Sequence, residues 1–162
     1  MKILTAVVLA AALLFARQVI AEDKEDKGSV NTNMEILMQK VKADKKLLVA
    51  ANMNLSDEEG KNFWPLYDAY QKELEKQNQQ LGKTIMEYAD AYNKGPVPDD
   101  TATKLMKQVF SVEKAQVKTK HEYAEKIGKV LSASKTARYI QIETKIRAAL
   151  MYEIAKQIPL VE

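Results

Sequence analysis

The sequence predicts an all-α fold of four helices, in which the second and third helices form a long antiparallel hairpin flanked by the first and fourth. Three observations support this fold class. Apolar residues recur at steps of three, four or seven along most of residues 34–157, the breaks between these stripes are short, and no window beyond residue 33 alternates between polar and apolar residues as a strand does. We therefore expect a single helical domain over residues 34–162.

The first 21 residues have the pattern of a secretory signal peptide. Lys2 provides a basic start, the apolar run 3–15 is too short to span a bilayer, and Ala21 is a small residue of the kind that precedes a cleavage site. We expect cleavage after Ala21 and export to the periplasm, with no integral membrane segment left in the mature chain. The alternative, an N-terminal membrane anchor, needs about 20 apolar residues and is interrupted at Arg17.

Charge and composition exclude several classes of protein. The chain has 25 Lys and Arg residues against 22 Asp and Glu residues, but Lys2 and Arg17 leave with the signal peptide, so the mature chain is nearly neutral. We expect no nucleic-acid partner, because such a partner requires a clustered basic surface. The chain contains no Cys, so packing alone must stabilise the fold.

The expected domain starts with a leader and a first helix. Residues 22–33 are charged or small and lack apolar periodicity, which predicts a disordered leader. The first helix is expected over residues 34–51, where Asn33 can cap its start and residues 52–54 break its pattern.

The second helix has a clear start and a clear end. Ser56 and Glu59 are spaced as a capping box, in which each side chain accepts a hydrogen bond from the backbone of the other residue. Residues 93–96 end the helix, because Gly95 can adopt a positive φ and the proline after it cannot continue the helix. Pro65 lies inside this span and predicts either a kink near residues 62–64 or a separate short first helix.

The third helix is expected to begin at a cap formed by Asp99 or Asp100 and to reach Val130. The fourth covers roughly residues 133–157. The second and third helices are each more than 30 residues long, about 50 Å at the usual rise, and the short loop between them makes them antiparallel. The stripe is thin between residues 74 and 85, so we expect the outer helices, a second subunit or a client protein to cover it.

Two short segments, Leu55-Ser56-Asp57-Glu58-Glu59 and Leu131-Ser132-Ala133-Ser134-Lys135, both start helices. They resemble the Leu-Thr-x-x-Gln signature that occurs twice in the Spy and CpxP family of periplasmic stress proteins, with Ser in place of Thr and with Glu59 and Lys135 in place of Gln. The resemblance implies a cradle-shaped helical-hairpin dimer that holds unfolded proteins without ATP or modulates an envelope sensor. Residues 63–67 and 155–161 look more like those of a group of small exported helical proteins whose role is not established.

Aromatic and Met side chains are the candidate protein-binding residues. The densest aromatic group begins seven residues after the second helix starts, and Met side chains at helical spacing can form an adaptable surface. The alternative for each is ordinary core packing, which we favour for the aromatic group. The candidates are Phe63, Trp64, Tyr67, Tyr70, Met86 and Met106, together with the helix-start residues Leu55, Ser56, Glu59, Leu131 and Ser132.

Catalytic chemistry has little support in the sequence. The chain has one histidine, His121, and no Cys, so neither a nucleophile with its base nor a zinc site with three or four ligands can be assembled from the usual residues. We expect no catalytic, metal-binding or cofactor-binding residues, and His121 to be a solvated helix position. The expected function is that of a periplasmic protein-binding protein, either an ATP-independent chaperone or an envelope-stress adaptor. The alternative is a regulatory or structural module that docks on one defined partner such as a sensor domain, and a homodimer is possible in either case.

Overall fold

The computed structural model describes residues 43–161 of the chain. Its helices cover residues 43–53, α3 (Asp57–Tyr92), α4 (Asp99–Gly128) and α5 (Ala133–Ala155), and these described residues contain no strand. The predicted all-α class with four helices is confirmed. The expected signal peptide, leader, Asn33 cap and first part of the first helix lie outside the described residues.

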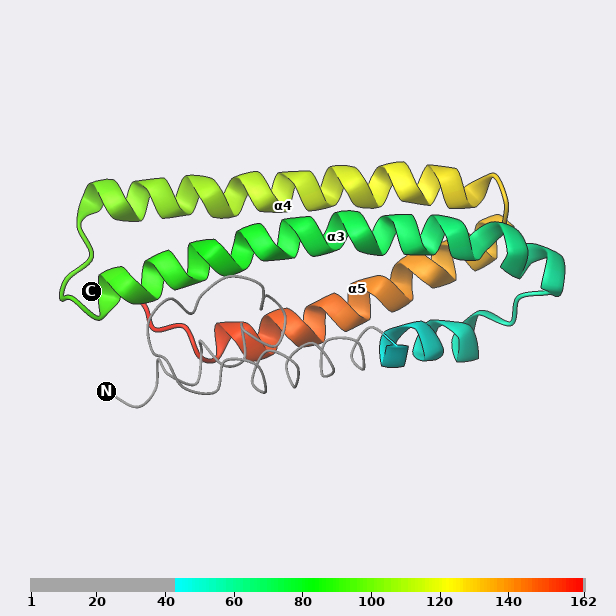
Figure 1. The fold of residues 1–162 in the computed structure, drawn as a ribbon, viewed down its shortest axis with the longest axis horizontal. Helices are drawn as coiled ribbons and strands as arrows, with labels where there is room; N and C mark the ends of the chain where they lie inside the picture. Colours follow the sequence, from blue (N-terminus) through cyan, green and yellow to red (C-terminus); the bar gives the residue numbers. More distant parts are fainter. Residues whose placement is uncertain (1–42, 162) are drawn as a thin grey trace, which may run out of the picture.

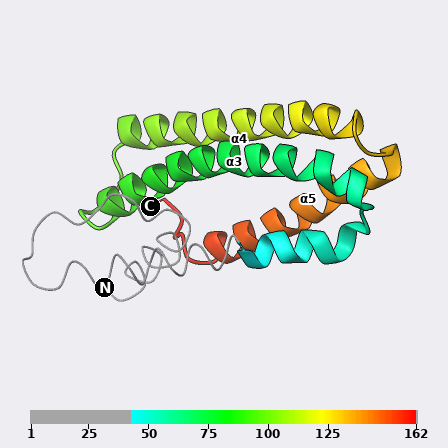
Figure 2. The ribbon, with the colours of Figure 1, turned by 45° about the vertical axis from the view of Figure 1, so that its right-hand side comes forward.

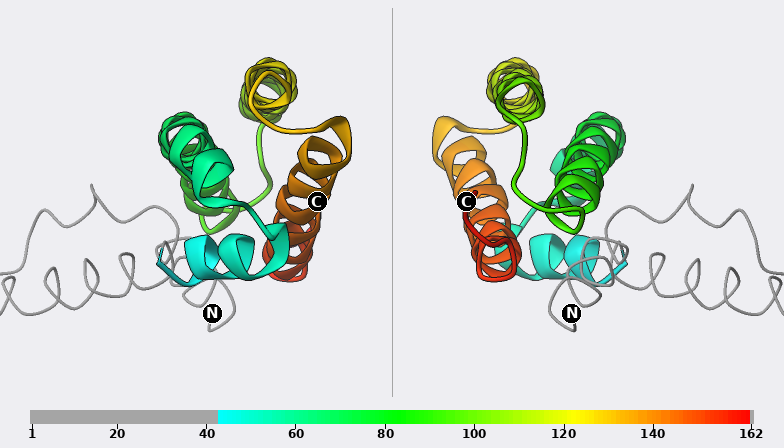
Figure 3. Two further views of the ribbon diagram at one scale, coloured as in Figure 1. Left: turned by 90° about the vertical axis from the view of Figure 1, so that its right-hand side faces the viewer. Right: turned by 90° about the vertical axis from the view of Figure 1, so that its left-hand side faces the viewer.

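The helices α3 and α4 lie side by side and antiparallel along the whole length of the molecule (Figure 1). The helix α5 starts beside the end of α4 and then runs obliquely away from it, as a second view also shows (Figure 2). Seen end-on, the helix of residues 43–53 lies across from α4, so that it and the three long helices surround a common interior (Figure 3). The expected hairpin with flanking outer helices is therefore present.

The predicted start and end of α3 are confirmed. The Glu59 amide donates to Ser56 Oγ at 3.2 Å, and the Ser56 amide donates to Glu59 Oε2 at 2.8 Å, which completes the capping box. Gly95 has a φ of 132° in the loop after Tyr92, a conformation that other residues rarely adopt. The loop geometry thus explains why a glycine stands at this position.

Four helix boundaries differ from the prediction, and two of them are the ends of α4 and α5, which come two residues earlier than expected, at Gly128 and Ala155. The N-cap of α4 is Pro98, and neither aspartate caps the helix: Asp99 and Asp100 lie in its first turn, where their charges still favour the positive helix end. The helix of residues 43–53 runs through Met53, two residues beyond its expected end, because Met53 is buried against the core. The chain turns instead at Asn54, which has a positive φ of 46°.

Pro65 does not divide the second helix. The helix α3 is continuous from Asp57 to Tyr92, so the alternative of a separate short helix is wrong. Its first turns bend away from the line of the remaining helix (Figure 1). A bend near a proline is expected, because its ring removes one backbone donor and crowds the preceding turn.

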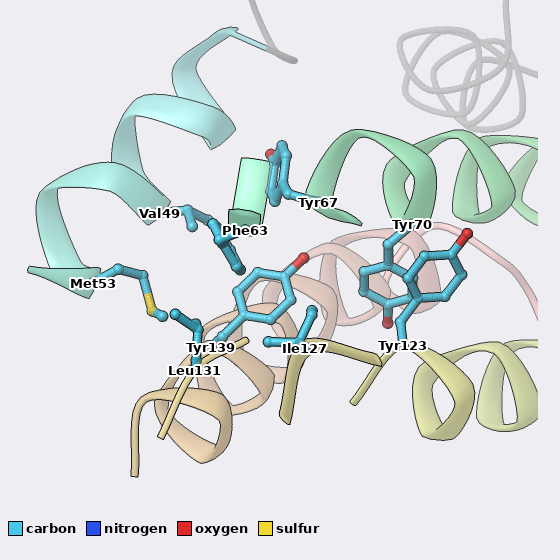
Figure 4. Close-up of a cluster of buried hydrophobic side chains, with 9 residues drawn as sticks. All are labelled: Val49, Met53, Phe63, Tyr67, Tyr70, Tyr123, Ile127, Leu131 and Tyr139. Atoms are coloured by element: carbon cyan, nitrogen blue, oxygen red, sulfur yellow. The ribbon is translucent and has the colours of Figure 1, made fainter. Parts of the chain in front are cut away.

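A cluster rich in aromatic residues fills the end of the molecule where the helix of residues 43–53 meets α3, α4 and α5. Figure 4 shows Tyr139 from α5 at its centre, between Phe63 and Ile127. The rings of Phe63 and Tyr139 meet edge to face with centroids 5.0 Å apart, a favourable aromatic geometry. We call this group the aromatic cluster; its members are Val49, Met53, Phe63, Tyr67, Tyr70, Tyr123, Ile127, Leu131 and Tyr139.

A smaller core lies toward the loop that joins α3 to α4. Its four buried residues, Leu81, Ile85, Val112 and Ile154, come from α3, α4 and α5, and we call it the aliphatic cluster. The C-terminal segment closes over it: Ile158 packs against the cluster, and the Tyr88 hydroxyl donates to the carbonyl oxygen of Pro159 at 2.9 Å. The tail therefore docks on the domain as far as Pro159, whereas the side chain of Leu160 is exposed.

Polar side chains join α3 to α4 between these two clusters. Gln77 Nε2 donates to Thr119 Oγ1 at 2.7 Å, and Gln116 Nε2 donates to Asn78 Oδ1 at 3.2 Å. Thr119 and Gln116 are buried. Where the sequence predicts a narrow apolar stripe in the middle of the hairpin, the structure thus has hydrogen bonds between amide and hydroxyl side chains.

Candidate protein-binding surface

Most of the aromatic residues predicted as binding candidates are core residues. Phe63, Tyr67 and Tyr70 have exposed fractions of 0, 3 and 2 %. Their burial contradicts a role as an exposed binding surface in this structure and agrees with the core alternative. Trp64 is half-buried at the margin of the cluster, 5.0 Å from the Phe63 ring.

Burial also determines the ionisation of the clustered tyrosines. Removal from water raises the pKa of Tyr67, Tyr70 and Tyr139 above the usual value of 10.0, and the nearby negative charge of Glu143 raises it further. The Tyr139 hydroxyl accepts a hydrogen bond from Gln71 Nε2 at 3.3 Å. These groups are neutral structural side chains at physiological pH.

The two helix-start motifs meet at one end of the molecule. Leu131 is buried in the aromatic cluster and Leu55 packs against it. Ser132 accepts from the Lys135 amide at 3.3 Å, as Ser56 does from the Glu59 amide.

The last residues of the two motifs pair with each other. Lys135 Nζ donates to Glu59 Oε2 and, at 3.0 Å, to the Asn54 carbonyl oxygen. The Lys135 ammonium, and secondly the Ser56 amide, hold the pKa of the Glu59 carboxyl below its usual range. The motif residues therefore join α3 to α5, and of the five helix-start candidates only Ser56 and Ser132 are exposed.

A polar network joins the helix of residues 43–53 to α3 and α5. Lys45 Nζ donates to Gln71 Oε1 at 2.6 Å and to Glu143 Oε2 at 2.8 Å. Gln71 Nε2 in turn donates to Glu143 Oε1 at 2.9 Å. The Glu143 carboxylate is buried, with an exposed fraction of 5 %, and these contacts give each of its oxygens a hydrogen-bond donor.

A groove lies between α4 and α5, over the stretch that separates the aromatic from the aliphatic cluster. We call it the central groove; its volume is about 330 Å³. It exists because α5 diverges from α4 after the loop that joins them, as Figures 1 and 2 show. Its apolar lining residues are Tyr70 and Leu74 of α3, Val117 of α4, and Ile146, Leu150 and Met151 of α5.

Charged residues also line the central groove. Glu113 and Lys120 stand on α4, and Arg147 stands on α5. None of these three side chains forms an ion pair with another residue in the described part of the chain. The groove thus combines an apolar lining with charges of both signs that are free to meet a partner.

An exposed apolar stripe runs along α4 from the central groove. Val117 lines the groove, and Phe110 and Met106 precede it by seven and eleven residues, which places all three on one face of the helix. Their exposed fractions are 63, 59 and 51 %. Three such side chains in a row are unusual for a helix whose other face is already buried.

The structure changes the set of candidate binding residues. Met106 is exposed on this stripe, as a surface candidate must be, whereas Met86 is half-buried in α3. Phe110 was not predicted. The sequence does contain a signal for an exposed apolar residue here: apolar residues at 105, 106, 109, 110 and 112 cover more of the helix circumference than packing against one neighbouring helix requires.

The described residues offer few groups for other chemistry. His121 is exposed, and its Nδ1 lies 3.5 Å from Glu125 Oε1. Residues 43–161 contain no group of three or more His, Cys, Asp or Glu residues arranged to hold a metal ion. None of the helices in this part of the chain is long and apolar enough to cross a membrane.

No protein-family model, no curated protein and no solved structure matches the chain. Membership of the family that the two motifs resemble therefore stays a prediction.

Proposed function

We propose that this protein is an exported helical protein that binds other polypeptides and catalyses no reaction, acting in the periplasm as an ATP-independent chaperone or stress adaptor. The observation that carries the proposal is the exposed stripe of Met106, Phe110 and Val117, which leads into the central groove. Apolar side chains of an unfolded or helical segment could pack against this stripe, while backbone and charged groups of the segment remain in water. Export rests on the sequence pattern of residues 1–21.

Client binding is tested by the aggregation of a denatured model protein in the presence of the mature chain, residues 22–162. We expect the chain to reduce light scattering when present in several-fold molar excess. The double substitution Phe110→Ser and Val117→Ser should remove at least half of this effect, because it replaces two exposed apolar contacts with hydroxyl groups. Unchanged aggregation with the unsubstituted chain would contradict the chaperone proposal.

A matched control is available in the C-terminal tail. Leu160 and Val161 are also more than half exposed but lie outside the central groove. Their double replacement by Ser should leave the protection unchanged, and an equal loss would show that general surface hydrophobicity is responsible. Affinity capture from envelope extracts separates the two forms of the proposal: many unfolded proteins indicate a chaperone, and one stoichiometric partner indicates an adaptor or accessory module.

A further inference from the structure

A second groove lies between the helix of residues 43–53 and α5, which lie next to each other in Figures 1 and 2, and it shares only Ile146 with the central groove. We call it the basic groove; its volume is about 600 Å³. Leu48 from the short helix and Ile142 and Ile146 from α5 provide its apolar floor. Leu48 keeps an exposed fraction of 48 %, so this floor is open to solvent.

The charges of the basic groove have one sign. Arg138 and Lys145 line it, and every other lining residue is uncharged. Neither cation forms an ion pair or a hydrogen bond with a residue in the described range 43–161. Asp44 lies on the same face of the short helix as Leu48, but it is not among the lining residues.

The two cations have a regular spacing. Arg138 and Lys145 are seven residues apart on α5, so they lie two turns, or about 10 Å, apart along one face of the helix. Ile142 lies between them on the same face. An amphipathic helix lying along α5 would match this pattern if it carried carboxylates two turns apart with leucine-type side chains between them. The Arg138 guanidinium could bind one such carboxylate with two parallel hydrogen bonds.

We infer that the basic groove is a docking site for an acidic amphipathic helix of a partner protein. Charge complementarity identifies this occupant, because two unpaired cations beside an apolar floor favour a ligand that carries carboxylates and leucine-type side chains together. A second copy of this chain does not fit. A symmetric contact would place Arg138 and Lys145 of one copy against the same cations of the other.

The inference goes beyond the proposed function, since it uses a different surface and a different class of ligand. Its test is fluorescence anisotropy with the mature chain and a labelled helical peptide that carries Glu at positions i and i+7 and Leu at positions i+3 and i+4. We expect binding that weakens as salt is added. A peptide with Lys in place of both Glu residues should bind at least tenfold more weakly.

Charge reversal in the protein gives the sharper result. The double substitution Arg138→Glu and Lys145→Glu should lower the affinity for the Glu peptide at least tenfold and should create affinity for the Lys peptide. The double substitution Lys107→Glu and Lys114→Glu is the matched control, because it makes the same charge change at two exposed lysines of α4 that are also seven residues apart and line neither groove. It should leave binding of the Glu peptide within about twofold, and circular dichroism should show that each variant is folded.

Three outcomes would overturn the inference. Equal binding of the Glu and Lys peptides would exclude charge recognition. An equal loss of affinity in the two double variants would show that binding depends on the net charge of the protein and not on the basic groove. Binding of phosphatidylglycerol vesicles that depends on Arg138 and Lys145, with no binding of the peptide, would assign the groove to a lipid surface instead. None of these results depends on Phe110 or Val117, so failure here and failure of the aggregation assay are distinguishable.

Discussion

The two ends of the hairpin are stabilised by different kinds of core. The aromatic cluster has nine buried residues, eight from four helices and Leu131 from the loop before α5, and Tyr139 makes edge-to-face contacts with Phe63, Tyr67 and Tyr70. The aliphatic cluster has four buried residues from three helices, and a tail closes it. Each cluster packs along a different part of the same α3–α4 pair, so the difference arises from what the flanking segments contribute.

This difference affects where exposed apolar surface can remain. At the aromatic end, the helix of residues 43–53 covers the hairpin, and Tyr139 of α5 is fully buried there. Beyond that end, α5 has diverged from α4, and the exposed stripe of Met106, Phe110 and Val117 occupies the α4 surface. A well-packed end can hold the fold while the other part keeps surface for a partner.

The largest expected effect is on stability at the aromatic end. Phe63→Ala should lower the free energy of unfolding by about 3–5 kcal/mol, because it removes a fully buried ring and leaves a cavity. Leu81→Ala in the aliphatic cluster should cost about 2 kcal/mol, at the low end for such a truncation, because its cluster is small. Urea unfolding followed by circular dichroism measures both values.

Phe110→Ala is the matched control for Phe63→Ala, since it makes the same chemical change at an exposed position. Its effect on the free energy of unfolding should stay within about 0.5 kcal/mol. If Leu81→Ala lowers the free energy of unfolding as much as Phe63→Ala does, the two clusters do not differ in their contribution to stability.

An effect on stability is also expected in alkali, from three tyrosines of the aromatic cluster. Burial raises the pKa of Tyr67, Tyr70 and Tyr139 in the folded chain above their usual value of 10.0. The free energy of unfolding is therefore unaffected by these tyrosines below pH 10 and declines above it, because the unfolded chain releases their protons and the folded chain retains them. The loss should be about 1.4 kcal/mol per tyrosine over each pH unit well above the usual value.

Tyrosinate absorbance and circular dichroism test this expectation when recorded together during an alkaline titration. Tyr67, Tyr70 and Tyr139 should ionise only as helicity is lost, in one cooperative step. Ionisation of all the tyrosines before any change in helicity would mean that the aromatic cluster is open to solvent.

The smallest effects concern two surface ion pairs, one near each end. A lysine hydrogen bond lowers the pKa of each acid: Lys135 acts on Glu59 and Lys104 acts on Glu87. A lowered pKa means that each contribution to stability is present above pH 4.5, the usual value, and is lost as pH falls below it. These pairs contribute little to overall stability because they lie at the surface: Lys104 and Glu87 are exposed, and Lys135 and Glu59 are partly exposed.

Carboxyl titration by NMR distinguishes the two pairs. Lys104→Met should return the pKa of Glu87 close to 4.5, because Gln108 is then the only hydrogen-bond donor that still lowers it. Lys135→Met should return the pKa of Glu59 only in part, since the Ser56 amide continues to donate to its carboxylate. Equal, complete recovery at both sites would indicate that the capping box does not affect Glu59.

Much of the fold follows from local sequence signals. Apolar periodicity predicts the helices, the Ser56 and Glu59 pair predicts the start of α3, and Gly95 predicts its end; the structure bears out each of them. The cap of α4 was mispredicted because two aspartates after Pro98 serve equally well in the first turn of a helix.

The surface was harder to predict than the fold. Phe63 and Phe110 both stand in amphipathic helices, but Phe63 is buried among residues of α5 and of the helix of residues 43–53, whereas Phe110 is exposed. The pairing of Glu59 with Lys135 joins residues 76 positions apart, and no local pattern encodes such a contact. Arg138 and Lys145 become a basic groove only where the helix of residues 43–53 lies beside α5.

The polar layer in the middle of the hairpin has a consequence for alignment. Two long helices with apolar steps of seven residues can slide past each other by one heptad and still bury apolar side chains. Such a shift would separate Gln77 from Thr119 and Asn78 from Gln116, and would leave their amides facing apolar side chains. These few hydrogen bonds therefore fix the register of α3 against α4. Apolar contacts alone would stabilise several alignments of the two helices about equally.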